Sequence, residues 1–251
     1  MVHGLISHDR IVNKIDNDIV GGLRMALAKP TPSSLSELEF ISRRLEEDIA
    51  LGRILPRERL IEEELADRFK VNRHVIRQVL SDLEGIGIIV RQRNKGATVR
   101  DLTPVDVENI YSVRELLEGK AAEMIKLPPD PAVLAELKDI HRRHSAAAAS
   151  GNFTDVFRLN LLFHKTFFAA CGNPQLAEAI QNFALKAHIA RSLTISDPAL
   201  LKRAVGEHGQ MIQLMEAGDR KRFVKMVVDH IIPSKDAYME NYRRRFGMAK
   251  P

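Results

Sequence analysis

The sequence predicts a mainly α-helical protein, with a small N-terminal domain of three helices and a β-hairpin followed by an antiparallel bundle of six helices. From Leu38 onwards, apolar residues recur at helical spacing. The clearest strand pattern lies between Ile88 and Arg100, where two apolar runs flank a turn. After this hairpin, a polar residue followed by proline repeatedly marks a helix start, as in Thr103-Pro104, Asp130-Pro131 and Asp197-Pro198.

The composition bounds the class of protein. A chain of 251 residues with 45% hydrophobic residues is long enough for one large domain or two modest ones. It contains no apolar run of the roughly 18 residues that a membrane span needs and no N-terminal signal pattern, so we expect a cytoplasmic protein without membrane contact. The single cysteine, Cys171, cannot build a disulfide framework and is expected to be buried and inert.

Residues 1–35 are expected to form an extension and a linker. Gly21 and Gly22 interrupt a partly helical pattern, and a segment rich in proline and serine follows at residues 29–34. Two interpretations stay open, a mobile tail and a strap that helps a dimer to form.

Residues 36–102 are expected to form the N-terminal domain. Asn72 is the expected N-cap of its third helix, which Gly85 and Gly87 are expected to end. Three helices followed by a basic hairpin are the winged helix-turn-helix arrangement, in which the third helix enters the major groove of DNA. The expected helices are 36–52, 61–69 and 73–84.

Positive charge is concentrated in this domain. Between Arg68 and Arg100 there are eight basic and two acidic residues, whereas the whole chain has a net charge of +5. Such a concentration is typical of a surface that contacts nucleic acid, and the alternative is an ordinary solvated surface. The expected DNA-contacting residues lie on the outer face of the third helix and in the hairpin: Asn72, Arg73, His74, Arg77, Gln78, Arg93, Lys95 and Gly96.

The N-terminal domain resembles the GntR family of bacterial transcription regulators. The resemblance lies in residues 59–80, Gly85-Ile86-Gly87 and Gly96-Ala97-Thr98-Val99. Members commonly show Val-Ser-Arg-Thr-Pro-Val-Arg-Glu-Ala-Leu where this chain has Val-Asn-Arg-His-Val-Ile-Arg-Gln-Val-Leu at positions 71–80. The resemblance implies that Arg73 and Arg77 contact DNA. It does not imply the same operator sequence, because the chain departs from the family pattern at Asn72, His74, Val75 and Gln78, and at Glu63, where some relatives have a further arginine.

Residues 103–247 are expected to form the six-helix bundle, because short connections favour antiparallel neighbours. The expected helices are 103–126, 130–149, 154–170, 174–192, 198–217 and 219–246. This part resembles the FCD effector-binding domain that defines the FadR subfamily, in residues 111–122, Phe163-His164 with Gly172-Asn173-Pro174 after it, Glu207-His208 and His230. The resemblance implies a ligand-responsive transcription regulator, not an enzyme, that binds a two-fold symmetric DNA operator as a homodimer.

Asn160 and His164 lie one helical turn apart in a strongly apolar segment, so both side chains are expected on one buried face, where they need partners. His208 and His230 are the expected partners. The resemblance to FCD domains implies a metal site, because many of these domains hold a divalent metal ion through an aspartate and three histidines. The matching residues here are Asn160, His164, His208 and His230. Nitrogen and oxygen donors suit Zn, with Ni or Mn as alternatives, and the asparagine is expected to weaken metal affinity because it lacks a full negative charge.

Four neutral ligands would leave a metal ion with its whole positive charge, so the expected effector is a small carboxylate. Arg114 and Arg191 are the expected carboxylate anchors; the alternatives are an ion pair of Arg114 with Glu118 and a solvated Arg191. Pro233 is expected to kink or end the last helix near the mouth of the site. Two rival functions stay open. One is a metal-free regulator that binds an acyl-thioester or another apolar ligand, and the other is a metal-dependent enzyme, for which the sequence offers no positioned base.

Overall fold

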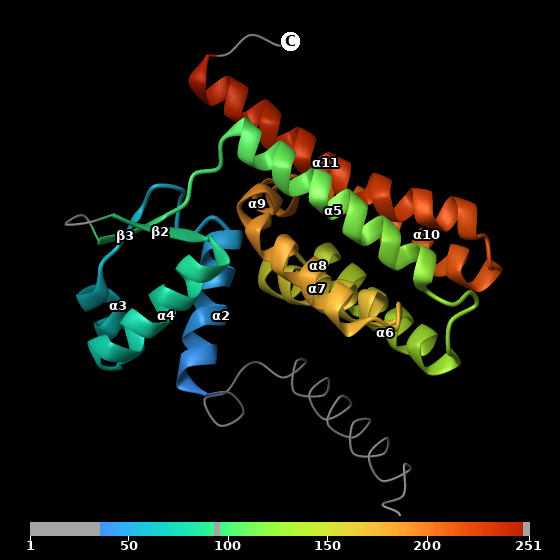
Figure 1. Cartoon of the computed structure of the whole chain (residues 1–251), viewed down its shortest axis with the longest axis horizontal. Helices are drawn as coiled ribbons and strands as arrows, with labels where there is room; N and C mark the ends of the chain where they lie inside the picture. Colours follow the sequence, from blue (N-terminus) through green and yellow to red (C-terminus); the bar gives the residue numbers. More distant parts are fainter. Residues whose placement is uncertain (1–35, 93–95, 248–251) are drawn as a thin grey trace, which may run out of the picture.

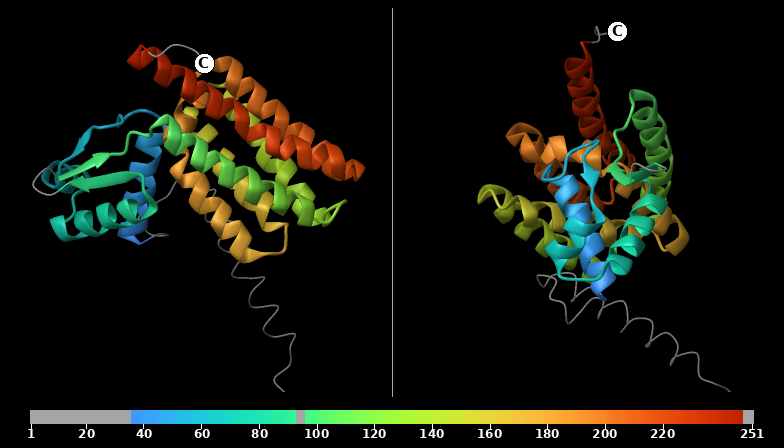
Figure 2. Two further views of the ribbon diagram at one scale, coloured as in Figure 1. Left: turned by 45° about the horizontal axis from the view of Figure 1, so that its top comes forward. Right: turned by 90° about the vertical axis from the view of Figure 1, so that its left-hand side faces the viewer.

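The computed structural model describes residues 36–92 and 96–247, apart from the side chains of Gln92 and of residues 191–194. The expected extension and the tip of the hairpin therefore lie outside the described residues. The chain forms a small N-terminal domain beside one end of a larger helical bundle (Figure 1, Figure 2). This mainly helical architecture with one small sheet confirms the predicted fold class. Among the described helices, none is both long and apolar enough to span a membrane.

The N-terminal domain is a winged helix-turn-helix. The central strand of its sheet, β3, is antiparallel to both neighbours, and Thr98 lies opposite Arg59 on one side and Val90 on the other. The first strand was not expected, because two residues are too few to show an alternating pattern. The elements are α2 (Glu37–Ala50), β1 (Arg59–Leu60), α3 (Glu62–Phe69), α4 (Arg73–Ile86), β2 (Ile89–Gln92) and β3 (Gly96–Val99).

Capping and an apolar face hold α4, the helix expected to contact DNA. The Oδ1 atom of Asn72 accepts a hydrogen bond from the backbone N–H of Val75 (3.0 Å), which forms the expected N-cap. The helix continues through Gly85 and ends at Gly87, whose φ of 89° favours glycine. One face of α4 is buried in the core that it shares with α2, through Ile76, Val79, Leu80 and Leu83. The opposite face is left to solvent.

The C-terminal bundle has seven helices within the described residues, where the sequence predicted six. The difference arises at Ala187, where the expected helix 174–192 divides in two without any glycine or proline to mark the break. The division lets the first part contact α5 while the second contacts α11 and α2. The helices are α5 (Pro104–Met124), α6 (Pro131–Ala149), α7 (Phe153–Ala169), α8 (Pro174–Lys186), α9 (His188–Ser196), α10 (Pro198–Ala217) and α11 (Arg220–Phe246).

The last helix, α11, runs beside α5 along the bundle and reaches Phe246, as expected (Figure 2). Pro233 was expected to kink or to end this helix, and the helix does not end there. Proline has no backbone N–H, so the carbonyl of Asp229 receives no helical hydrogen bond from this position. Further along, the hydroxyl of Tyr238 donates to the carbonyl of Leu102 (2.9 Å). The helix is thereby tied to the segment that leaves the wing.

The two domains share an apolar core where they meet. Ile189 and Ala190 of α9 belong to the same buried cluster as the inner faces of α2 and α4. A polar contact adds to it, because Arg53 donates from Nη2 to Oγ1 of Thr154 in α7 (2.8 Å). The bundle helices α7 and α9 therefore lie directly against the N-terminal domain.

Candidate DNA-binding surface and ligand cavity

The expected DNA-contacting residues lie on one exposed surface where the structure describes them. Asn72, Arg73, His74, Arg77 and Gln78 are all exposed, at the start and on the outer face of α4, and Gly96 is exposed at the start of β3. Arg93 and Lys95 lie outside the described residues. The exposed face of α4 is therefore free to meet a DNA groove.

Both arginines of α4 are paired with acidic residues of α3. Arg77 donates from Nε to Oε2 of Glu62 (2.8 Å), and Arg73 donates from Nη2 to Oε1 of Glu63 (2.6 Å). Exposed pairs of this kind contribute about 0–1 kcal/mol, so DNA can replace them at little cost. The Arg77 pair engages Nε and not the two terminal nitrogens of the guanidinium. The sequence did not predict these pairs, because they join residues ten and fifteen positions apart.

Three histidines from three helices meet inside the bundle. His164 comes from α7, His208 from α10 and His230 from α11, and their ligand nitrogens all lie within 4.8 Å of one another. The Nε2 atoms of His208 and His230 are 3.2 Å apart. The ring of His208 is fully buried, and burial together with the neighbouring His230 and His164 holds its pKa well below the usual range. The structure thus brings together the three histidines that the sequence singled out.

Glu207 fixes the orientation of His230. Its Oε2 lies 2.7 Å from Nδ1 of His230, and its Oε1 accepts a hydrogen bond from Arg203 (2.6 Å). Burial opposes ionisation of this carboxyl, but the hydrogen bonds from His230 and Arg203 outweigh it and hold the pKa of Glu207 below its usual range. An ionised carboxylate can only accept, so Nδ1 of His230 donates to Glu207 and Nε2 faces His208. Glu207 had no expected role, although the spacing of Arg203 and Glu207 in the sequence is that of a helical ion pair.

Two of these histidines, His208 and His230, are spaced as ligands of one divalent metal ion are. Two nitrogens bound to one ion at about 2.0–2.1 Å lie roughly 2.9–3.4 Å apart for octahedral to tetrahedral angles. The 3.2 Å between the two Nε2 atoms falls in that range. A carboxylate on the far nitrogen of a ligating histidine, as Glu207 provides for His230, is the usual outer partner in metal sites.

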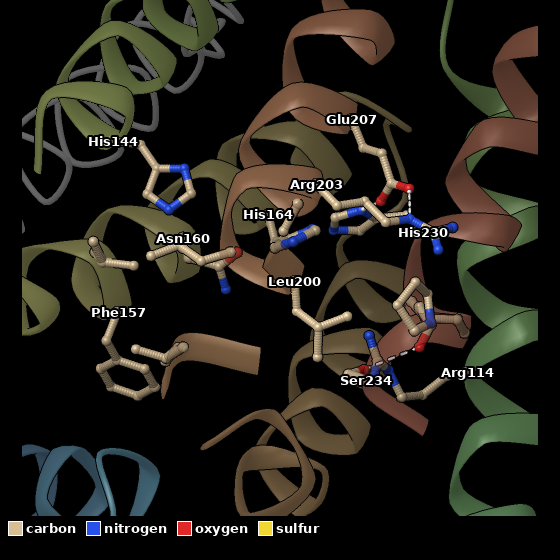
Figure 3. A pocket seen from close by; sticks show the side chains of 16 residues that line it. Arg114, His144, Phe157, Asn160, His164, Leu200, Arg203, Glu207, His230 and Ser234 are labelled. Atoms are coloured by element: carbon tan, nitrogen blue, oxygen red, sulfur yellow. Dashed lines mark hydrogen bonds and ion pairs between the residues drawn. The ribbon is translucent and has the colours of Figure 1, made fainter. Parts of the chain in front are cut away.

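A cavity opens beside the three histidines (Figure 3). Asn160, half-buried on α7, lines this cavity, and its side chain reaches into it next to His164. The other residues of the lining combine polar and apolar side chains: Arg114, His144, Val156, Phe157, Ile195, Leu200, Leu201, Arg203, Ala204, Glu207, Ile231, Pro233 and Ser234, with His164 and His230.

Of the two expected carboxylate anchors, only Arg114 has a side chain within the described residues. Arg114 forms the ion pair with Glu118 that was the alternative to a ligand role, with Nε 2.7 Å from Oε1, yet it also lines the cavity. Its Nη1 is buried and, in the described part of the chain, has no hydrogen-bond partner. Arg191 lies in α9, and its side chain is outside the described residues.

His144 of α6 also lines the cavity and was missed by the sequence analysis. Its ring is buried and lies 5.2 Å from the ring of His208, centroid to centroid. Burial lowers the pKa of His144 to about 4, and electrostatic repulsion from His141 and His230 lowers it in the same direction, so the ring is neutral at physiological pH. Nothing in the sequence around it marked it, because its neighbours come from other helices.

The fold and these sites define a transcription regulator in which a winged helix-turn-helix is joined to a helical domain. Residues 38–99 match the family described as bacterial regulatory proteins, gntR family, and residues 109–232 match the FCD domain. The chain belongs to the GntR family of regulators and carries an FCD domain.

The chain is similar to other regulators along most of its length. It is 27% identical over 205 residues to YdhC of Bacillus subtilis, an uncharacterised HTH-type transcriptional regulator; the match covers 81% of this chain and 90% of YdhC. Among solved structures it resembles Escherichia coli McbR/YncC, with a TM-score of 0.73, 18% identity, and coverage of 83% of this chain and 99% of that one. It also resembles a putative GntR transcriptional regulator from Rhodococcus sp. RHA1, with a TM-score of 0.70 and 17% identity. That match covers 83% of this chain and 100% of the other. Relatives and fold are those of transcription regulators, which confirms that the chain is not an enzyme.

Proposed function

We propose that this protein is a FadR-subfamily regulator whose binding to a DNA operator changes when a small carboxylate binds at a metal site in its helical domain. The observation that carries the proposal is the meeting of His164, His208 and His230 beside a cavity. Three histidines from three helices, two of them buried and one, His230, half-buried and oriented by a carboxylate, suit a divalent ion of the Zn, Ni or Mn type.

His164, His208 and His230 would hold the ion, and Asn160 would add its side-chain oxygen. Bound there, the ion would supply a positive charge that attracts an anion. The chain's own residues do the rest. Glu207 keeps His230 in the tautomer that a ligand needs, and Arg114 offers its unpaired Nη1 to a carboxylate.

The DNA-binding half would act through α4. We propose that Arg77 reads a guanine edge and that Arg73, with one terminal nitrogen engaged by Glu63, contacts a phosphate. As a homodimer, the protein would place two copies of α4 on a two-fold symmetric operator, where the spacing of the half-sites is fixed by geometry. A small rotation of one domain is then enough to change operator affinity.

Communication between the two halves would run through α7. This helix carries Asn160 and His164 at the cavity, and it also carries Arg158, which is paired with Glu47 of α2. Because α2 packs on α4, a shift of α7 on ligand binding is passed to the DNA-contacting helix.

The test uses full-length protein purified without a histidine tag. We expect elemental analysis to find a divalent metal, and thermal midpoints to fall with EDTA and to recover with Zn²⁺. We expect a further rise with a small carboxylate only when metal is present. Absence of metal, with no response to Zn²⁺, would instead favour the metal-free regulator of apolar ligands.

A further inference from the structure

His144 is a buried polar residue whose hydrogen-bonding capacity is unused. It is 1% exposed, and within residues 36–92 and 96–247 neither of its ring nitrogens has a hydrogen-bond partner. Buried polar groups are nearly always paired in proteins, and an unpaired one opposes folding. The position on the cavity wall means that a bound molecule can supply the missing partner.

His144 is separate from the three histidines of the candidate metal site. That group contains only His164, His208 and His230, and His144 approaches it from α6. In Figure 3 the ring of His144 lies on the Asn160 side of the cavity, whereas Arg114 lies on the opposite side, next to Ser234. Among the described residues that line the cavity, the two with unpaired buried nitrogens, Arg114 and His144, therefore lie at different ends of it.

The kind of ligand group that suits His144 follows from hydrogen-bond chemistry. A neutral imidazole has one nitrogen that donates and one that accepts. A carboxylate can only accept, and an alkyl group can do neither. A hydroxyl group can donate to the accepting nitrogen or accept from the donating one, so it suits the ring in either tautomer.

We propose that His144 recognises a hydroxyl group of the effector, so that the ligand is a hydroxycarboxylate whose acid group lies toward the histidine cluster and Arg114. This inference rests on the proposed function, since it assumes that a carboxylate binds in the cavity. It adds a specificity-determining residue that belongs to none of the motifs of the chain.

The first measurement needs no ligand. The variant His144→Leu replaces the ring by an apolar side chain of similar size and removes two unpaired nitrogens. The thermal midpoint of the ligand-free variant is expected to rise by about 2–4 °C. A fall of several degrees would mean that His144 supports the fold, which overturns the inference.

The second measurement compares matched acids. Butyrate and its 2-, 3- and 4-hydroxy derivatives are titrated into full-length, metal-loaded protein by calorimetry. At least one hydroxybutyrate is expected to bind about tenfold or more tightly than butyrate, and His144→Leu is expected to remove that advantage while leaving the affinity for butyrate unchanged. The control His141→Leu, one turn earlier on α6 and outside the cavity lining, is expected to keep the advantage.

Two results would overturn the inference in distinguishable ways. If butyrate and all three hydroxybutyrates bind equally to the unaltered protein, or if His144→Leu keeps the preference, hydroxyl recognition by His144 is wrong and the carboxylate site stands. If none of the four acids binds, the inference fails together with the carboxylate effector of the proposed function.

Discussion

Arg158 of α7 forms an ion pair with Glu47 of α2, with Nη2 2.7 Å from Oε2. The glutamate is 3% exposed and also pairs with Arg44 and Arg53. Arg158 lies two residues before Asn160 in the same helix. The pair therefore joins the helix that lines the cavity to the helix on which α4 packs.

The variant Arg158→Met is expected to uncouple the two domains without unfolding either. Glu47 keeps Arg44 and Arg53 as partners, so no buried charge is left unpaired. The ligand changes operator affinity by a certain ratio, and in the variant this ratio is expected to be at least threefold closer to one. A change of that size lies within the range of about 0.5–2 kcal/mol by which such mutations alter coupling. Fluorescence anisotropy with labelled operator measures this ratio. Arg142→Met, which breaks an exposed pair with Asp139 on α6, is the control, and an unchanged ratio in Arg158→Met would exclude this route.

Removal of Arg77 is expected to weaken operator binding by about 10–100-fold, the effect of losing a bidentate contact with guanine. The side chain is exposed and its partner Glu62 stays solvated, so thermal stability is expected to stay unchanged. A mobility-shift titration of Arg77→Ala tests this. Arg222→Ala, a change of equal charge at an exposed site on α11, is the control. Full affinity in Arg77→Ala would remove this residue from the DNA-contacting surface.

Glu62→Gln is expected to lower specificity while raising non-specific affinity. The change removes a negative charge beside the exposed face of α4, and it replaces the charged acceptor that orients Arg77 through Nε by the weaker, neutral acceptor of an amide. The ratio of operator affinity to affinity for unrelated DNA is expected to fall about threefold or more. Titrations of both duplexes at two salt concentrations measure it, and an unaltered ratio would show that Glu62 does not position Arg77.

Asn160→Asp is expected to raise metal affinity and to weaken carboxylate binding. The aspartate adds a negative charge at the cavity wall beside His164, which favours a cation and repels an anion. Competition with a metal-chelating dye is expected to give metal affinity about 10–100-fold higher, and calorimetry is expected to give weaker carboxylate binding. The matched control is Asn109→Asp, an exposed residue of α5 far from these ligands in sequence. If neither affinity changes, Asn160 is not part of the site.

Glu207→Gln is expected to lower metal affinity by about 10–100-fold, because an amide holds His230 less firmly than a carboxylate does. The same dye competition measures the loss. Glu216→Gln, an exposed residue of α10 paired with Lys138, is expected to leave metal affinity unchanged. Equal affinities in the two variants would contradict the role given to Glu207.

The features that the sequence predicted well depend on neighbours in the chain. Asn72 caps α4 and Thr103 caps α5, as their local patterns indicated. The division at Ala187 was not predictable in this way, because it follows from packing against different helices and no local residue type marks it.

In the candidate sites too, the residues marked by local sequence motifs were predicted, and those that depend on contacts between helices were not. His164, His208 and His230 were grouped through motif order, and the structure brings them together. His144 and the pairing of Arg77 with Glu62 were missed, because each depends on contacts between different helices.

The central claim is that a carboxylate bound at the histidine cluster changes operator affinity. Its most direct test is a fluorescence anisotropy titration of metal-loaded, full-length protein on an operator selected from a random-sequence library, with and without the hydroxybutyrates and butyrate. We predict a change in operator affinity of at least fivefold with one of these acids, and loss of that change when EDTA removes the metal. An acid that binds the metal-loaded protein at saturation and leaves operator affinity unchanged would contradict the claim.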